Sequence, residues 1–102
     1  MQFIINAYDA TDENALERRM SIRPQHLEGI KKVKEVGSVV CAGGITDENG
    51  RVKGSYLVMN FPTKELFDEY LKNEPYVVNG VWEKINVECC NVVIVNDEKV
   101  GK

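Results

Sequence analysis

The sequence predicts an α+β domain in which four antiparallel strands form one sheet and two helices cover one of its faces. Three observations lead to this fold class. Four short segments are rich in β-forming residues, and two others carry apolar residues at helical spacing. The segments follow one another in the order β-α-β-β-α-β, and an Asn-Gly turn joins the two central strands. The length of 102 residues fits a single domain.

The first half of the chain contains a strand, a helix and a second strand. FIINAY, residues 3–8, is a short apolar run of β-forming residues. A helical turn is expected near residues 16–20, and RPQHLEGIKKVKEVG, residues 23–37, has a helical period that ends at Gly37. SVVCAGG, residues 38–44, has the composition of a buried strand, and its two glycines mark the end.

The second half contains a hairpin arm, a helix and the last strand. VKGSYLVMNF, residues 52–61, follows the turn TDENGR. In TKELFDEYLKN, residues 63–73, Thr63 is the expected cap, and Pro75 ends the helix. The apolar face of this helix is expected to comprise Leu66, Phe67, Tyr70 and Leu71. VWEKINVECCNVVIV, residues 81–95, is the last strand, so the domain spans residues 1–95, with a disordered tail at 96–102.

The order of the elements is that of the ferredoxin-like fold, the split β-α-β arrangement. Phe3 and Ile5 point to one face of the first strand and Ile4 to the other, because side chains alternate along a strand. Both faces of the sheet are therefore apolar, whereas the helices can cover only one. A second copy of the sheet is the simplest cover for the other face, which predicts a homodimer.

The charge and hydropathy of the chain narrow its partners. The formal net charge is −3 and the pI is about 5.2, whereas binding to nucleic acids or anionic membranes favours a basic surface. No apolar run approaches the roughly 20 residues of a membrane-spanning helix, and MQFIINAYDA lacks the features of a signal peptide. We therefore expect a cytoplasmic protein that binds neither nucleic acids nor membranes.

The three cysteines fit a reducing compartment. Cys89 and Cys90 are adjacent and Cys41 stands alone, which is not the paired spacing of a disulfide framework. We expect the thiols to be reduced and to serve as small core residues. One histidine and no CxxC motif leave little material for a zinc site, so we expect no metal and no cofactor.

The topology predicts where polar residues meet. One edge of the sheet collects the end of the first strand, the start of the first helix, the end of the second strand, the end of the second helix and the start of the last strand. The residues brought to that edge are Asp9, Arg23, His26, Gly43, Glu74 and Tyr76. His26, the only histidine, lies within about 40° of Ile30 and Val33 on a helical wheel, so its ring is expected to face the sheet.

Two roles are open for His26. In the first, it is a partly buried helix residue whose ring bonds to a carboxylate or a carbonyl. In the second, it is a general base or acid. Its expected place in the first helical turn, near the positive end of the helix dipole, favours a neutral imidazole, which Glu74 or Asp9 would orient.

Three segments together resemble one known family. LERRMSIRPQHL, residues 16–27, the AGG triplet at 42–44 and EPYVVNGVW, residues 74–82, are similar to the YciI-like (YCII-related) proteins, and the similarity extends over roughly residues 1 to 92. The resemblance implies a dimeric α+β barrel built from ferredoxin-like subunits. It also implies an active site around a histidine and an acidic residue, and one member of the family is a dehydrochlorinase acting on chlorinated hydroxyquinols.

The resemblance carries over residue by residue. The histidine of the family falls on His26, and Arg19, Ser21 and Arg23 match the segment that precedes it. The aspartate of its Asp-Pro motif is replaced here by Glu74, whose side chain is one methylene longer.

The surrounding residues have both structural and binding interpretations. Arg19 and Arg23 are surface cations or ligands of an anion. Ser21 is a helix N-cap or part of the site. Gly43 is a turn residue, or it lets a ligand approach the backbone, and Tyr76 is a core residue or stacks on a ring.

These observations favour a small cytoplasmic dimeric enzyme that performs elimination or isomerisation. His26 would act as general base or acid, Glu74 or Asp9 would orient it, and Arg19 and Arg23 would hold a small anionic or phenolic substrate. The alternative is a non-catalytic small-ligand-binding or interaction module on the same scaffold, which the glutamate at position 74 favours. A monooxygenase acting on heme or quinols is a third, weaker hypothesis.

Overall fold

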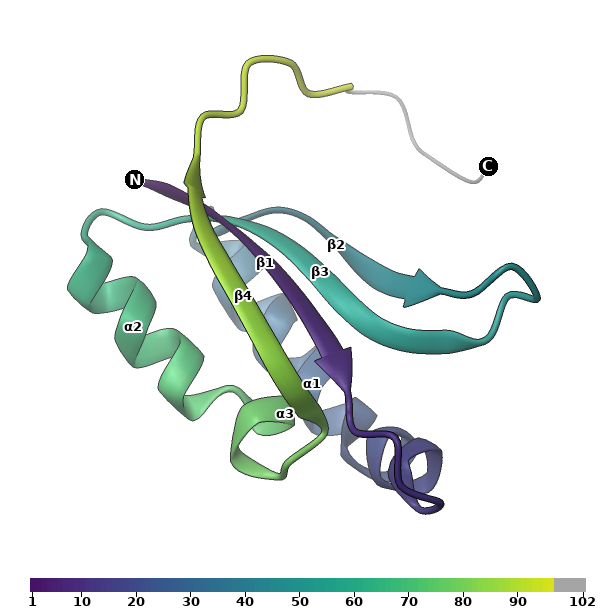
Figure 1. The fold of residues 1–102 in the computed structure, drawn as a ribbon. Helices are drawn as coiled ribbons and strands as arrows, with labels where there is room; N and C mark the ends of the chain where they lie inside the picture. Colours follow the sequence, from purple (N-terminus) through teal and green to yellow (C-terminus); the bar gives the residue numbers. More distant parts are fainter. Residues whose placement is uncertain (97–102) are drawn as a thin grey trace.

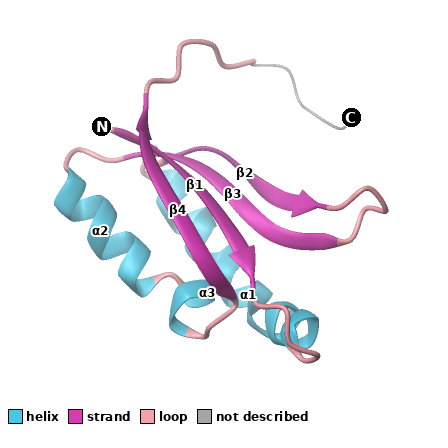
Figure 2. Cartoon of the chain, in the orientation of Figure 1, coloured by secondary structure: helices cyan, strands magenta, loops and turns pink. Residues whose placement is uncertain are grey.

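Four antiparallel strands form one sheet in the computed structural model, which describes residues 1–96. The strands lie in the order β2-β3-β1-β4 across the sheet, and the helices lie on one side of it (Figure 1; Figure 2). The strands are β1 (Gln2–Asp9), β2 (Val39–Thr46), β3 (Val52–Asn60) and β4 (Trp82–Cys90). The helices are α1 (Ala15–Glu35), α2 (Lys64–Asn73) and α3 (Pro75–Val78).

The predicted ferredoxin-like α+β fold is confirmed, with one addition. The short helix α3 follows α2 directly, because Pro75 occupies the first turn of α3, where its missing N–H costs nothing. Thr63 caps α2 as expected, since its hydroxyl accepts the backbone N–H of Leu66 at 3.2 Å. The predicted tail lies outside the described residues, except for Asn96.

The core lies between the sheet and the helices. Phe3, Ile5 and Ala7 of β1 are buried, while Ile4 lies on the other face, as the alternation predicts. Phe3 stacks on Phe67 of α2 with ring centroids 4.1 Å apart. The expected apolar face of α2 is partly wrong, because Leu66 on this helix remains half exposed.

The first helix differs from the prediction. The expected helical turn and the expected helix join into α1, which runs without a break from Ala15 to Glu35 and contains Pro24. Proline removes one intrahelical hydrogen bond at a cost of about 3 kcal/mol. The helix nevertheless continues through Pro24, and its apolar residues Ile22, Ile30 and Val33 pack against the core. His26 therefore lies near the middle of a helix, and the dipole argument for a neutral imidazole, which applies to the first turn, is wrong.

Ser21 is not a helix cap. It lies inside α1, and its hydroxyl donates to the carbonyl oxygen of Arg18 at 2.9 Å. Asn14 holds the N-cap position, seven residues earlier in the chain. Ser21 lies inside the helix for the same reason as Pro24: tertiary packing extends α1 through residues with weak helical propensity.

The two glycines at 43 and 44 do not end the second strand, which continues to Thr46. Gly43 lies opposite Tyr56 of β3, and a Cβ atom added at this position would lie 2.6 Å from the Tyr56 hydroxyl oxygen. Gly43 is therefore a strand glycine that makes room for a cross-strand aromatic side chain, instead of a turn residue.

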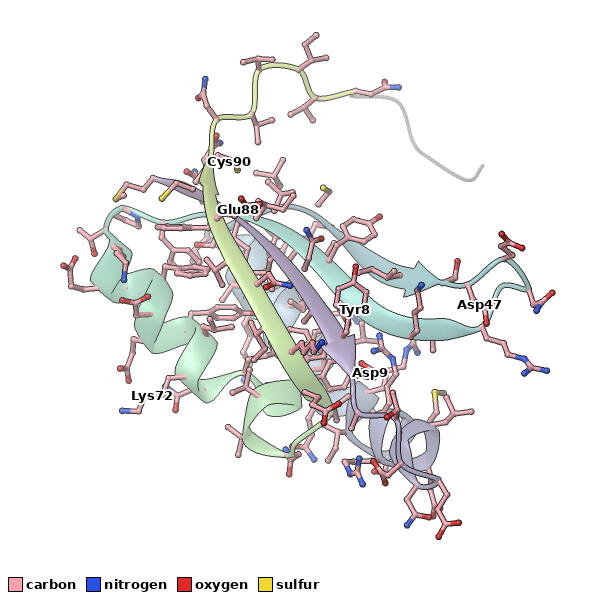
Figure 3. All side chains as sticks on the ribbon, in the orientation of Figure 1. Tyr8, Asp9, Asp47, Lys72, Glu88 and Cys90 are labelled. Carbon is pink, nitrogen blue, oxygen red and sulfur yellow. The ribbon has the colours of Figure 1, made fainter. Side chains whose placement is uncertain are left out.

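The cysteines do not occupy the core of the subunit, so that part of the prediction is wrong. Cys41 and Cys89 are exposed and Cys90 is half-buried, and all three are free. Cys41 lies on the edge strand β2, and Cys90 lies at the far end of β4 (Figure 3), so these thiols lie away from the cluster of core residues. No helix in the described part of the chain is long and apolar enough to cross a membrane.

Candidate active site

A buried contact joins His26 to Glu74. The Nδ1 atom of His26 lies 2.6 Å from Oε1 of Glu74, and only 11% and 1% of the two side chains are exposed. His26 comes from the middle of α1, and Glu74 lies between α2 and α3, where it caps α3. Of the two acids that the sequence left open, Glu74 is the one in contact with the imidazole.

Hydrogen-bond donors surround the Glu74 carboxylate. Oε1 also accepts the backbone N–H of Tyr76 at 3.1 Å, and Oε2 accepts the hydroxyl of Tyr70 at 2.8 Å. Three donors therefore converge on one buried carboxylate. An ionised carboxylate can only accept hydrogen bonds, so Nδ1 of His26 carries the proton in this contact.

The other ring nitrogen of His26 is free. Nε2 has no hydrogen-bond partner within residues 1–96. In that region no side-chain nitrogen or oxygen is both buried and without a partner, so Nε2 is accessible. His26 lines a pocket of about 220 Å³ between α1 and strands β2 and β3. In the neutral imidazole, Nε2 is therefore an accessible proton acceptor, which is the arrangement of a general base.

Tyr76 is packed between two side chains of α1. Its ring stacks on His26 with centroids 4.0 Å apart and planes 9° apart, and the guanidinium carbon of Arg19 lies 4.9 Å from its centroid. Arg19 and His26 are two helical turns apart, about 10.5 Å along the axis, which leaves room for one ring between them. Burial raises the pKa of Tyr76, although the charges of Arg19 and Arg23 oppose this shift.

Asp9 belongs to a second buried ion pair. Its carboxylate, at the end of β1 (Figure 3), accepts two hydrogen bonds from Nη1 of Arg19, at 2.9 and 3.0 Å. Nη2 of Arg19 donates to Oγ of Ser55 at 3.0 Å. Arg19 and Asp9 therefore neutralise each other, and the Asp9 carboxylate is committed to Arg19.

Arg23 is the cation that remains available at the pocket. It is exposed, it lines the same pocket as His26, and it forms no salt bridge within residues 1–96. Gly43 also lines this pocket. Ser21 does not, because it faces a separate depression beside Asn14 and Arg18.

Three residues of the site were missed by the sequence analysis. Ser55 accepts hydrogen bonds from Arg19 and from Nε1 of Trp82, at 3.0 and 3.1 Å, and Tyr70 reaches Glu74. The alternation in β3 could have identified Ser55, since it is the polar member of the buried series that continues with Leu57 and Met59. No comparable signal identifies Tyr70, because its spacing in the sequence is that of a residue on the apolar face of its helix.

The fold and the pocket together define a class of protein: a ferredoxin-like α+β domain with a histidine–carboxylate pair beside a small cavity. Residues 1–91 match the model of the YCII-related domain. The chain belongs to the YCII-related family.

Relatives in the family support the same assignment. The chain is similar to Protein YciI of Escherichia coli, with 31% identity over 94 residues that cover 86% of this chain and 94% of the relative. It is also similar to Aspercryptin biosynthesis cluster protein B of Emericella nidulans, with 35% identity over 72% of this chain and 51% of that protein.

Two solved structures share the fold. A 5-chloro-2-hydroxyhydroquinone dehydrochlorinase from Burkholderia phenoliruptrix, in complex with 2,5-dihydroxybenzoquinone, superimposes with a TM-score of 0.76 at 20% identity, covering 89% of this chain and 94% of that one. A dimeric ferredoxin-like protein of unknown function from Jannaschia gives a TM-score of 0.52 at 15% identity, covering 89% and 98% of the two chains. At these identities, the similarity establishes the fold.

The Tyr70–Glu74 contact predicts a loss of stability at alkaline pH. Burial, followed by the charge of Glu74 and the hydrogen bond to it, raises the pKa of Tyr70. The folded state therefore holds this proton at pH values where the unfolded chain, with a phenol pKa of about 10, has lost it. The contribution is complete below that pKa and falls above it, by up to about 1.4 kcal/mol per pH unit for one proton.

Urea unfolding between pH 9 and 11 measures this dependence. Tyr70→Phe should flatten the decline in the free energy of unfolding relative to the wild-type protein, while Tyr76 leaves a residual slope. Identical slopes for the two proteins would show that the Tyr70 hydroxyl does not titrate differently in the folded state.

Proposed function

We propose that the protein is a small enzyme in which His26 transfers a proton and Glu74 orients it, on a small anionic or phenolic substrate. The observation that carries the proposal is the single contact of Nδ1 with Glu74, which leaves Nε2 facing the pocket. Elimination or isomerisation is the reaction class that such a pair can serve without a cofactor.

In this mechanism, Nε2 removes a proton from a substrate carbon next to a carbonyl or enol. In an elimination, the electron pair of the broken C–H bond forms a double bond and expels a leaving group as an anion. In an isomerisation, this electron pair shifts the double bond, and the proton returns to another carbon. The substrate is neither oxidised nor reduced overall. Glu74 stabilises the imidazolium formed in the step, because its buried carboxylate is in contact with Nδ1 of the ring.

The pocket favours a small oxygen-bearing substrate. Its volume of about 220 Å³ lies below the range of about 300–1,000 Å³ typical of pockets for drug-sized ligands, which suits a single ring. Arg23 supplies an uncompensated positive charge at the pocket, and Ala42, Gly43 and Gly44 form a β2 wall with small or absent side chains. The dehydrochlorinase with the same fold was solved with 2,5-dihydroxybenzoquinone, a ligand of this size and chemistry.

The alternative is a binding module without catalysis. One observation favours it: Glu74 also caps α3 and accepts the Tyr70 hydroxyl, so the His26–Glu74 pair also holds the three helices together. Under this alternative, His26 would be retained for stability, and its replacement would weaken folding more than any chemical step.

The proposal includes a cytoplasmic homodimer. The sheet face opposite the helices carries Ile4, Tyr8, Tyr56 and Val58, and Tyr8 and Tyr56 are 39% and 37% exposed. An exposed apolar face of this kind favours a second copy as its cover, and the neighbour from Jannaschia is a dimer. Three free thiols in a chain with net charge −3 suit a reducing compartment.

Chloride release from 5-chloro-2-hydroxyhydroquinone tests the catalytic proposal. His26→Asn should lower the rate by about 10²–10⁴ at a temperature where the variant is folded, because it removes the acid–base group. Ser21→Ala is the matched control, since Ser21 lies on the same helix but outside the pocket, and it should keep the wild-type rate. An unchanged rate in His26→Asn, or a wild-type protein that releases no chloride, contradicts the proposal for this substrate class. Under the structural alternative, His26→Asn loses about 1–3 kcal/mol of stability, and the wild-type protein releases no chloride.

Sedimentation equilibrium tests the dimer. The wild-type protein should sediment with twice the chain mass of 11.5 kDa, and Tyr56→Glu should dissociate it by placing a charge in the apolar contact. Leu66→Glu, on the exposed side of α2, is the control and should leave the dimer intact. A wild-type mass equal to one chain would contradict the dimer.

A further inference from the structure

Two hydroxyl groups at the pocket donate no hydrogen bond within residues 1–96. Ser55 is 2% exposed and Tyr76 is 0% exposed, and both line the pocket that contains His26. A buried O–H without an acceptor is unfavourable. Each of these groups is therefore suited to an oxygen atom that a ligand brings.

The two hydrogen-bond partners of Ser55 determine what its hydroxyl hydrogen can do. Its Oγ accepts Nη2–H of Arg19 at 3.0 Å and Nε1–H of Trp82 at 3.1 Å. Guanidinium and indole N–H groups can only donate, so they occupy both lone pairs of the hydroxyl oxygen. The hydroxyl hydrogen must point elsewhere, and it donates no hydrogen bond within residues 1–96.

The same arrangement strengthens Ser55 as a donor. Arg19 is itself held by the Asp9 carboxylate through two hydrogen bonds, so the serine oxygen accepts from a guanidinium group that is fixed in place. Hydrogen bonds in such a chain polarise one another, which makes the Ser55 hydroxyl a stronger donor. Hydrogen bonds to an ionised acceptor are stronger than those to a neutral one, so such a donor favours an oxygen anion.

Tyr76 contributes a second donor. Its ring stacks on His26 and lies near the guanidinium group of Arg19, and its hydroxyl donates no hydrogen bond within residues 1–96. Burial raises its pKa, so the hydroxyl keeps its proton and remains a donor.

We infer that Ser55 and Tyr76 bind the oxygen anion of a phenolate or enolate ligand, with Arg23 as an uncompensated cation that lines the same pocket. The inference rests on the proposed function, because it assigns the ligand chemistry of the same pocket. Ser55 and Tyr76 are binding residues in this account, and neither takes part in proton transfer. An oxygen anion held here would carry the negative charge that develops when His26 removes a proton from the same molecule.

Binding of two matched probes tests this inference. 4-Nitrophenol, at a pH where it is ionised, offers an oxygen anion, whereas 4-nitroanisole has the same ring and a methyl group on that oxygen. The wild-type protein should bind the phenolate more tightly than the ether in titration calorimetry. Ser55→Ala and Tyr76→Phe should each weaken binding of the phenolate by about 10- to 100-fold and leave binding of the ether unchanged.

Three variants separate this role from a structural one. Tyr76→Phe removes a hydroxyl that bonds to no described residue, so it should fold even if Ser55→Ala does not. Ser55→Thr keeps the hydroxyl and should restore the preference for the phenolate. Ser21→Ala, the matched serine outside the pocket, should behave as wild type. Equal losses for both probes, no loss in either variant, or a wild-type protein without preference for the phenolate would overturn the inference.

The outcome is independent of the catalytic test. If His26→Asn retains chloride release while the phenolate preference depends on Ser55 and Tyr76, the proposed function fails and the binding assignment stands. If His26→Asn loses turnover while both probes bind equally in all variants, the binding assignment fails and the acid–base role of His26 stands.

Discussion

The contact between His26 and Glu74 is the interaction on which the pocket depends. A buried carboxylate is tolerated only when donors surround it, and here the imidazole, a phenol and a backbone N–H supply them. Because these donors come from α1, α2 and α3, satisfying one charge also fixes the helices relative to one another. The same contact determines which nitrogen of His26 is left for chemistry.

A second buried ion pair, between Asp9 and Arg19, lies near the first. Asp9 and Arg19 compensate each other, and Arg19 then positions Ser55 and covers the ring of Tyr76. Removing one member of such a pair leaves an uncompensated charge, which is costly in a buried position. The two pairs therefore stabilise the fold and shape the pocket at the same time, and the stacked ring of Tyr76 lies between them.

The fold could be predicted because topology depends on patterns that single residues rarely disturb. The strand and helix segments, the Asn-Gly turn and the two-sided β1 strand led to the correct arrangement, and the edge of the sheet correctly brought His26 near Glu74. The start of α1 could not be predicted, since Pro24 and Ser21 are typical of helix ends and only tertiary burial extends the helix past them. The choice between two acids, and the role of Ser55, depend on distances that sequence does not contain.

The most direct test of this account is the tautomer of the imidazole. The chain has one histidine, so a long-range ¹H–¹⁵N correlation spectrum of uniformly labelled protein reports on His26 without assignment. At a pH where the ring is neutral, the account predicts a proton on Nδ1, held by Glu74, and an unprotonated Nε2, with this preference lost in Glu74→Ala. A neutral ring protonated on Nε2 in the wild-type protein would contradict it, because the pocket would then face a proton donor where the account places a base.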